Sequence, residues 1–367
     1  MWGDIAIAFL LAFITTFVMT PKTIKLAKKV GAVDSPLDER RINKVVMPRL
    51  GGLAVIAGFV VSVIYLIFIM HIEGSINLFG IERYGMKLLG FFIGALVIGI
   101  TCYIDDLKDI PALVKLTAQI ISALIVVAFG IKIEHINIPF LQGRELSEIF
   151  SVILTVGWIV GVTNAINLID GLDGLSSGIS LISCISLIII FSLNGSPIIA
   201  IILIAALAGA LTGFLPFNFN PAKTFIGDTG SNFLGYTLAV VSILGIAKTY
   251  TLIVIVAPLL VLALPVFDTL MAIIRRIKNG KSLKAVIEPD NGHLHHKMLR
   301  KGFTQKQAVL ILYGISATLG MFTIILLESG IWKAISFALI ILAIIGLGYK
   351  NMFQEQEENE EKKDEII

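Results

Sequence analysis

Runs of apolar residues long enough to cross a bilayer are the strongest constraint in this sequence. A membrane-spanning helix needs roughly 20 such residues. The chain has 367 residues, of which 56% are hydrophobic, and its mean hydropathy is +0.92. Because lipid cannot satisfy backbone hydrogen bonds, each apolar run should cross as a helix. The sequence therefore predicts an all-α, polytopic membrane protein.

About eleven transmembrane helices can be drawn along the chain. The predicted spans are 4–20, 50–70, 88–104, 116–131, 149–163, 178–193, 197–215, 233–247, 251–267, 307–327 and 331–348. Several are short, which is typical of helices that stop early to line a site. We expect residues 1–350 to form one integral membrane domain, and 351–367 to be an acidic, disordered cytoplasmic tail.

The distribution of basic residues predicts the orientation. Most Lys and Arg residues occur in alternate loops, at 22–49, 108–115, 223, 275–306 and 350–363. The positive-inside rule places these loops in the cytoplasm, the N-terminus outside and the C-terminus inside. No internal repeat is evident, which weighs against an inverted-repeat transporter.

An acid pair ends one span on the predicted cytoplasmic side. Asp105 and Asp106 should repel each other unless a cation intervenes or a pKa rises. Such a pair could serve a divalent ion or act as a base on a metal-held substrate. The alternative is a solvated helix end, although the preceding run is apolar and other polar motifs share this face.

A second polar segment follows the span 149–163. Its polar residues recur every third position, at Asn164, Asn167, Asp170 and Asp173. On a helix this spacing forms one polar ridge. Gly171 and Gly174 could instead form a turn whose N–H groups meet a ligand. An ordinary Gly/Asp turn is the less favoured alternative in so apolar a context.

A third segment, Phe225 to Asn232, precedes another span. Gly227 and Gly230 flank Asp228 at an expected helix N-terminus, where phosphate is attracted by free N–H groups and the helix dipole. Asp228 could hold a metal that bridges phosphates; alternatively, Asp228 or Thr229 could simply cap the helix.

Histidines and isolated cations complete the set of candidates. His293, His295 and His296 could bind a metal, or donate to phosphate or sugar oxygens. No cysteine or nearby acid completes a tetrahedral set, which favours anion or sugar contacts over zinc, and a surface cluster is the alternative. Candidate substrate contacts among the cations are Lys44, Arg49 and Lys115, although positive-inside anchoring explains most basic residues.

Acids, cations and glycine turns on one membrane face fit phosphoryl-type chemistry. There, a divalent ion and positive side chains neutralise charge on a transferring pyrophosphate. A membrane location implies a lipid substrate, and a cytoplasmic mouth implies a soluble activated donor. The rival classes are a transporter for a phosphorylated lipid or sugar, whose polar residues should lie near mid-span, and a non-catalytic scaffold.

The ordered motifs resemble one enzyme family over nearly the whole chain. They are Lys44–Gly52, Asp105-Asp106, Asn164–Gly174, Gly227–Ser231 and His293–His296. The chain is similar to polyprenyl-phosphate N-acetylhexosamine-1-phosphate transferases, of glycosyltransferase family 4 type. This resemblance implies that a lipid phosphate attacks the sugar-bearing phosphorus of a UDP-activated amino sugar. UMP is then released, and a lipid-linked pyrophosphoryl sugar forms.

The resemblance also implies roles for individual residues. It implies Mg²⁺, with Mn²⁺ as a substitute, held by Asp228, Asn167 and Asp106. The implied catalytic residues are Asp105, Asp106 and Asp228, and the first two act jointly on the lipid phosphate. The resemblance places four residues near the nucleoside: Lys44, Asp170, Asp173 and Phe225. It implies that four others contact the sugar or phosphate: Arg276, His293, His295 and His296. Arg49, Lys115 and Asn164 remain candidate substrate contacts.

Two branches of the family compete. The stretches Phe267-Asp268-Thr269, Ile274-Arg275-Arg276 and His293-Leu294-His295-His296 look like the branch that uses UDP-N-acetylglucosamine and undecaprenyl phosphate. That branch starts teichoic acid, O-antigen or related cell-envelope glycans. The alternative is the phospho-N-acetylmuramoyl-pentapeptide transferase of peptidoglycan synthesis, which typically has three consecutive histidines. We expect a plasma-membrane enzyme with a cytoplasmic active site, lipid contacts, no nucleic-acid partner and a homodimeric state.

Overall fold

The computed structural model describes residues 1–34, 46–76, 78, 80, 83–134, 146–246, 252–280 and 292–342. The predicted acidic tail at 351–367 and the candidate ligand Lys44 lie outside these residues.

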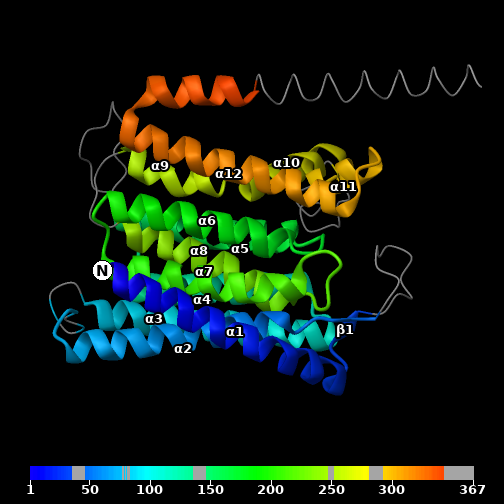
Figure 1. Cartoon of the computed structure of the whole chain (residues 1–367), viewed down its shortest axis with the longest axis horizontal. Helices are drawn as coiled ribbons and strands as arrows, with labels where there is room; N and C mark the ends of the chain where they lie inside the picture. The colour runs from blue at the N-terminus through cyan, green and yellow to red at the C-terminus, as the bar shows by residue number, and fades with distance from the viewer. Residues whose placement is uncertain are drawn as a thin grey trace, which may run out of the picture.

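Antiparallel helices arranged along one axis make up the described chain (Figure 1). The helices are α1 Trp2–Val30, α2 Gly51–Ile72, α3 Tyr84–Lys108, α4 Ala112–Ala128, α5 Glu148–Ile169, α6 Leu175–Leu193, α7 Ile198–Asn218, α8 Gly227–Ile246, α9 Leu252–Val261, α10 Ala263–Gly280, α11 Leu294–Arg300 and α12 Gln305–Ser329. A further apolar helix covers Ile331–Leu342. The strands β1 Val33–Asp34 and β2 Met47–Pro48 pair antiparallel. The predicted helical class is confirmed, and the small β pairing is an addition to it.

Seven of these helices are long and apolar enough to cross a membrane: α1, α2, α3, α5, α6, α7 and α12. The other predicted spans fall on different elements. Helix α4 and the helix Ile331–Leu342 are shorter, and α8 opens with the polar turn Gly227–Asn232. The predicted span 251–267 falls on two helices, because α9 ends at Val261 and α10 begins at Ala263. The described chain thus has seven candidate spans, against eleven predicted ones.

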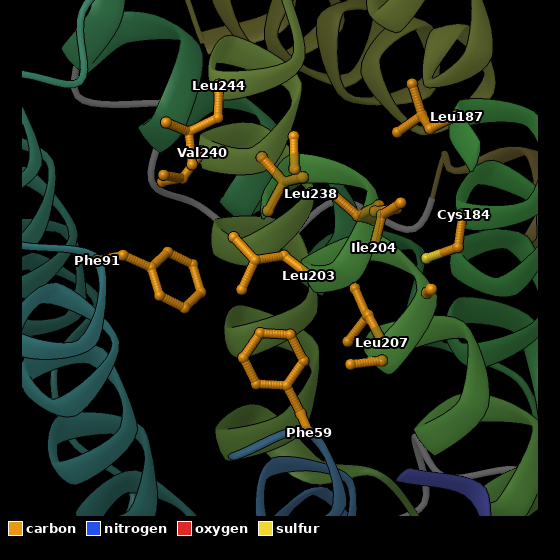
Figure 2. Packing of buried hydrophobic residues seen from close by; sticks show 14 of the residues in the cluster. Phe59, Phe91, Cys184, Leu187, Leu203, Ile204, Leu207, Leu238, Val240 and Leu244 are labelled. Carbon is orange, nitrogen blue, oxygen red and sulfur yellow. The ribbon is translucent and has the colours of Figure 1, made fainter. Parts of the chain in front are cut away.

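Helix α7 forms the centre of the core. Helices α1, α2, α6 and α8 all pack against it, and Figure 2 shows Leu203, Ile204 and Leu207 among side chains of α2, α3, α6 and α8. Small residues bring α1 close. A Cβ at Gly209 would lie 2.0 Å from the Phe9 carbonyl oxygen, so this contact requires glycine.

The functional motifs gather at the end of the bundle that carries β1 and α11, opposite the N-terminus (Figure 1). Backbone pairing there joins α2 to α8. The Gly51 N–H donates to the Phe225 carbonyl at 3.0 Å, and Gly52 donates to Ile226 at 2.8 Å. A Cβ at Gly52 would lie 2.3 Å from the Gly230 Cα. Glycine at position 52 therefore lets two helix N-termini meet.

Candidate active site

Asp105 closes the turn between α3 and α4. It lies in the last turn of α3 and is 3% exposed. Its Oδ1 accepts a hydrogen bond from the Ile110 N–H at 2.8 Å, and its Oδ2 accepts one from Lys115 Nζ at 2.8 Å. The sequence placed this acid beside other motifs, and the structure adds Lys115 as its counter-charge.

Asp106 caps helix α8. Its Oδ1 accepts from the Asp228 N–H and its Oδ2 from the Thr229 N–H, both at 2.9 Å, and the Thr229 hydroxyl adds a third bond. A carboxylate at this position satisfies free N–H groups and complements the helix dipole. Gly227 has a φ of +71°, and a Cβ there would lie 2.0 Å from the Arg49 carbonyl oxygen.

Asp228 is the point at which four helices meet. Lys115 Nζ lies 3.1 Å from Asp228 Oδ2 while it also holds Asp105, so one ammonium bridges two carboxylates. From α5, Asn167 donates its amide to Asp228 Oδ1 at 2.7 Å and to the Ser231 hydroxyl at 2.9 Å. The structure thus brings Asp105, Asp106, Lys115, Asn167 and Asp228 into one cluster, which we call the acid cluster.

Two further predicted residues lie next to the acid cluster. Arg49 Nε is 4.0 Å from Asp106 Oδ1, and Arg49 Nη1 is 3.6 Å from Asp109 Oδ1. Asn164 lies one turn before Asn167 and donates to Gln119 Oε1 at 2.7 Å. Asn164 therefore contacts the neighbouring helix α4. Its predicted role was a contact with substrate.

Asp170 follows the last turn of α5. Its Oδ1 accepts from the Ser176 hydroxyl at 2.6 Å. Burial and the charges of Asp228 and Asp106 raise the pKa of Asp170 to about 7, against the hydrogen bond from Ser176 and the charge of Arg49, which oppose the rise. The carboxyl is therefore within electrostatic reach of the acid cluster.

Asp173 holds the loop between α7 and α8. The residue is buried, and its Oδ2 accepts from Asn220 Nδ2 at 2.9 Å and from the Ala222 N–H at 3.1 Å. Asn220 also donates to Gln305 at the start of α12. The predicted nucleoside contact Phe225 lies in the same loop, half-buried, with its N–H bonded to the Pro48 carbonyl.

The histidine segment is fixed to α10 by Asp268. Asp268 Oδ2 lies 2.9 Å from His293 Nδ1, and Asp268 Oδ1 accepts from the Leu294 N–H at 3.0 Å. Because an ionised carboxylate only accepts, Nδ1 carries the proton. Arg276 lies about two turns further along the same helix, half-buried.

His295 packs on the turn that follows Asp170. A Cβ at Gly171 would lie 2.3 Å from His295 Nε2. Burial, together with the neighbouring His296 and His293, lowers the pKa of His295 to about 3. The ring of His296 is 4.2 Å from that of His295. The α5–α6 turn therefore links the histidines to the acid cluster.

Sequence reasoning missed several residues of this site. Ser231 and Asn232 lie inside a motif that was noted for its acid, its glycines and Thr229 as a helix cap. Asp268 lies in a stretch that was used only to distinguish family branches. Gln119 had a signal of its own, because an amide inside the apolar span 116–131 is costly in a membrane and marks a functional position.

Comparison with known proteins identifies the family. The family profile for glycosyl transferase family 4 matches residues 88–246. A Bacillus subtilis protein is 38% identical over 340 residues, which cover 93% of this chain and 89% of the relative. It is named a probable undecaprenyl-phosphate N-acetylglucosaminyl 1-phosphate transferase. The chain belongs to glycosyl transferase family 4. This confirms the resemblance drawn from the motifs.

Two more relatives carry similar names. A decaprenyl-phosphate N-acetylglucosaminephosphotransferase of Mycobacterium tuberculosis is 33% identical, over 84% of this chain and 79% of its own length. The undecaprenyl-phosphate alpha-N-acetylglucosaminyl 1-phosphate transferase of Escherichia coli K12 is 28% identical, over 78% of this chain and 74% of its own length. These names match the activity predicted for the N-acetylglucosamine branch.

Proposed function

We propose that this chain transfers N-acetylglucosamine-1-phosphate from UDP-N-acetylglucosamine to undecaprenyl phosphate. The observation that supports this most is the acid cluster at one end of an apolar helix bundle, in a chain whose relatives are named for this reaction. The products are UMP and a lipid-pyrophosphoryl sugar that starts a cell-envelope glycan.

The donor set of the acid cluster fits Mg²⁺. Asp228 and Asn167 offer carboxylate and amide oxygens, the ligands that this ion prefers. Within the described ranges, no group of three or more His, Cys, Asp or Glu side chains has metal-binding geometry. Few protein ligands, with phosphates and water as the others, are usual for Mg²⁺. When bound, the ion would neutralise charge on the donor diphosphate.

Asp106 is the third residue that the sequence placed at the metal. Both of its oxygens accept hydrogen bonds from the first turn of α8. We therefore propose Asp228 and Asn167 as the ligands, and assign Asp106 to holding the turn that presents Asp228.

The reaction needs one phosphorus–oxygen bond to form and one to break. An oxygen of the lipid phosphate attacks the sugar-bearing phosphorus, and UMP leaves with the electron pair of the broken bond. Asp105 is placed to position that phosphate or to accept its proton, while Lys115 and Arg49 stabilise the charge that builds up on the transferring group. Asp170 and Phe225 would face the nucleoside, and the histidine segment would close over the sugar phosphate.

The transporter alternative is less well supported by the geometry. Every residue of the acid cluster lies in the first or last turns of its helix, at one end of the bundle. A transport site would place polar groups near the middle of the spans. The cluster suits a soluble donor that meets a lipid headgroup at the membrane surface.

We also propose the finer topology predicted from the sequence. Eleven crossings, formed by α1 to α8, the α9–α10 pair, α12 and the helix Ile331–Leu342, put the N-terminus outside and the acid cluster at the cytoplasmic face of the plasma membrane. A reporter fused after Ile367 should be cytoplasmic, and one inserted in residues 74–80 should be external. The reverse pattern would contradict the proposed orientation.

A two-donor assay tests the activity. Purified protein with Mg²⁺ and undecaprenyl phosphate should release UMP from UDP-N-acetylglucosamine, and EDTA should stop the release. UDP-N-acetylmuramoyl-pentapeptide serves as the second donor. Release from the second donor alone would assign the chain to the peptidoglycan branch, and release from neither would contradict the proposal.

A further inference from the structure

We infer that Gln119 is a positioning residue that sets the geometry of Asp228 and Asn167 through a layer of three side-chain amides, those of Asn164, Gln119 and Asn232. The inference deepens the proposed function, on which it rests. Gln119 belongs to α4 and is 3% exposed. Its side chain bonds Asn164 and Asn232, and so joins the two helices that carry Asn167 and Asp228.

The amide layer lies one turn below the acid cluster. Gln119 follows Lys115 by four positions on α4, Asn232 follows Asp228 by four on α8, and Asn164 precedes Asn167 by three on α5. Residues three or four apart lie on the same face of a helix. Each member of the amide layer therefore lies beneath one member of the acid cluster.

The three shorter hydrogen bonds of this layer run in one direction, and Gln119 Nε2 also donates back to Asn164 Oδ1 at 3.4 Å. Asn164 Nδ2 donates to Gln119 Oε1 at 2.7 Å, and Gln119 Nε2 donates to Asn232 Oδ1 at 2.8 Å. Asn232 Nδ2 then donates to the backbone carbonyl of Asp228 at 2.9 Å. Since each amide has one donor end and one acceptor end, reversing any member would oppose like atoms.

Burial makes any other arrangement of these hydrogen bonds costly in free energy. Asn232 is 1% exposed, and Gln119 lies within an apolar helix. An unpaired amide costs more in such surroundings than at a surface, so a satisfied network fixes one arrangement. The layer thus holds the relative positions of α4, α5 and α8 at the level where Lys115, Asn167 and Asp228 meet. Mutation of residues that orient metal ligands from outside the site typically lowers activity or metal affinity 10–100-fold.

The test compares Gln119→Met with Ser122→Ala. Methionine fills a similar volume without hydrogen bonds. Ser122 is the matched control, because it is buried on the same helix and bonds the Gly94 carbonyl on α3, outside the amide layer. With UDP-N-acetylglucosamine, undecaprenyl phosphate and Mg²⁺, we expect kcat of Q119M to fall 10–100-fold with KM for the donor within about twofold. S122A should keep the wild-type kcat.

A second readout does not depend on turnover. Lys115 is held between two carboxylates, so an amine-acylating reagent should label it slowly in the wild type and in S122A. Labelling measured by mass spectrometry should be several-fold faster in Q119M. A wild type that releases no UMP refutes the proposed function, whereas unchanged labelling of Lys115 in Q119M refutes the role of Gln119.

A double variant tests the route through Asn232. If Gln119 acts through this residue, Q119M combined with Asn232→Leu should lose no more kcat than the worse single variant. The inference would be overturned if the kcat losses of the two single variants multiply in the double variant, or if Q119M keeps the wild-type kcat. If Q119M does not fold, Gln119→Asn, which keeps the amide but is one methylene shorter, takes its place with the same expected outcomes.

Discussion

Replacing Asp170 with Asn should stabilise the protein above pH 7. The turn after α5 holds the carboxyl in surroundings that raise its pKa to about 7, so its ionisation at higher pH opposes folding. Asparagine removes the charge but keeps an Oδ1 that can accept from the Ser176 hydroxyl. The substitution therefore removes only the free-energy cost of ionising this carboxyl in the folded state.

The size of the effect follows from the pKa. A rise from 3.8 to about 7, at about 1.4 kcal/mol per unit, gives an upper limit of about 4 kcal/mol. Access of water to the half-buried carboxyl reduces the expected value to about 1–2 kcal/mol. Because the folded state holds the proton more tightly, wild-type stability falls as pH rises from about 4 through 7. D170N should lack this decrease.

Thermal unfolding in detergent with EDTA, at several pH values from about 4 to 8, measures the difference. D170N should melt higher than the wild type at pH 8, and the two should melt about equally near pH 4, where the unfolded carboxyl also begins to hold its proton. Glu148→Gln, an exposed acid at the other end of α5, is the control and should show no such trend. A D170N protein that is less stable at pH 8, or a gain independent of pH, would refute the reasoning. Under the proposed function, the stabilised variant should have a higher KM for the donor.

Two further substitutions probe the supports of the site. Gly52→Ala places a Cβ 2.3 Å from the Gly230 Cα and should cost about 1–3 kcal/mol of stability by overpacking, seen as a lower Tm. Gly99→Ala, which meets open space, is the control, and equal Tm values for the two would contradict the close approach of α2 and α8. Asp268→Asn keeps an acceptor for the Leu294 N–H but turns an amide towards His293 Nδ1. It should lower kcat about 10–100-fold with little change in Tm, and an unchanged kcat and pH–rate profile would exclude a positioning role.

The sequence was sufficient to predict the helical class and the polar motifs, because both depend on local patterns. Long apolar runs and basic loops require no tertiary information. The ends of helices were harder to predict. The span 251–267 reads as one run by hydropathy, yet α9 and α10 divide it.

Hydrogen-bond partners could not be predicted from the motifs alone. The sequence presents Asp106 as one half of an acid pair, but its bonds go to residues 122 and 123 positions away. Asp173 continues the three-residue spacing of its motif, yet α5 ends at Ile169, so the expected ridge does not extend to it. Its carboxylate bonds the α7–α8 loop. Such choices depend on which helices are neighbours.

Turnover of Asp228→Ala tests the central claim most directly. If α3, α4, α5 and α8 converge to hold a magnesium diphosphate against a lipid phosphate, loss of this carboxylate should lower UMP release by about 10²–10³-fold. Glu134→Ala, an exposed acid outside the acid cluster, should retain activity. Normal UMP release by D228A, with folding and Mg²⁺ dependence intact, would contradict the account.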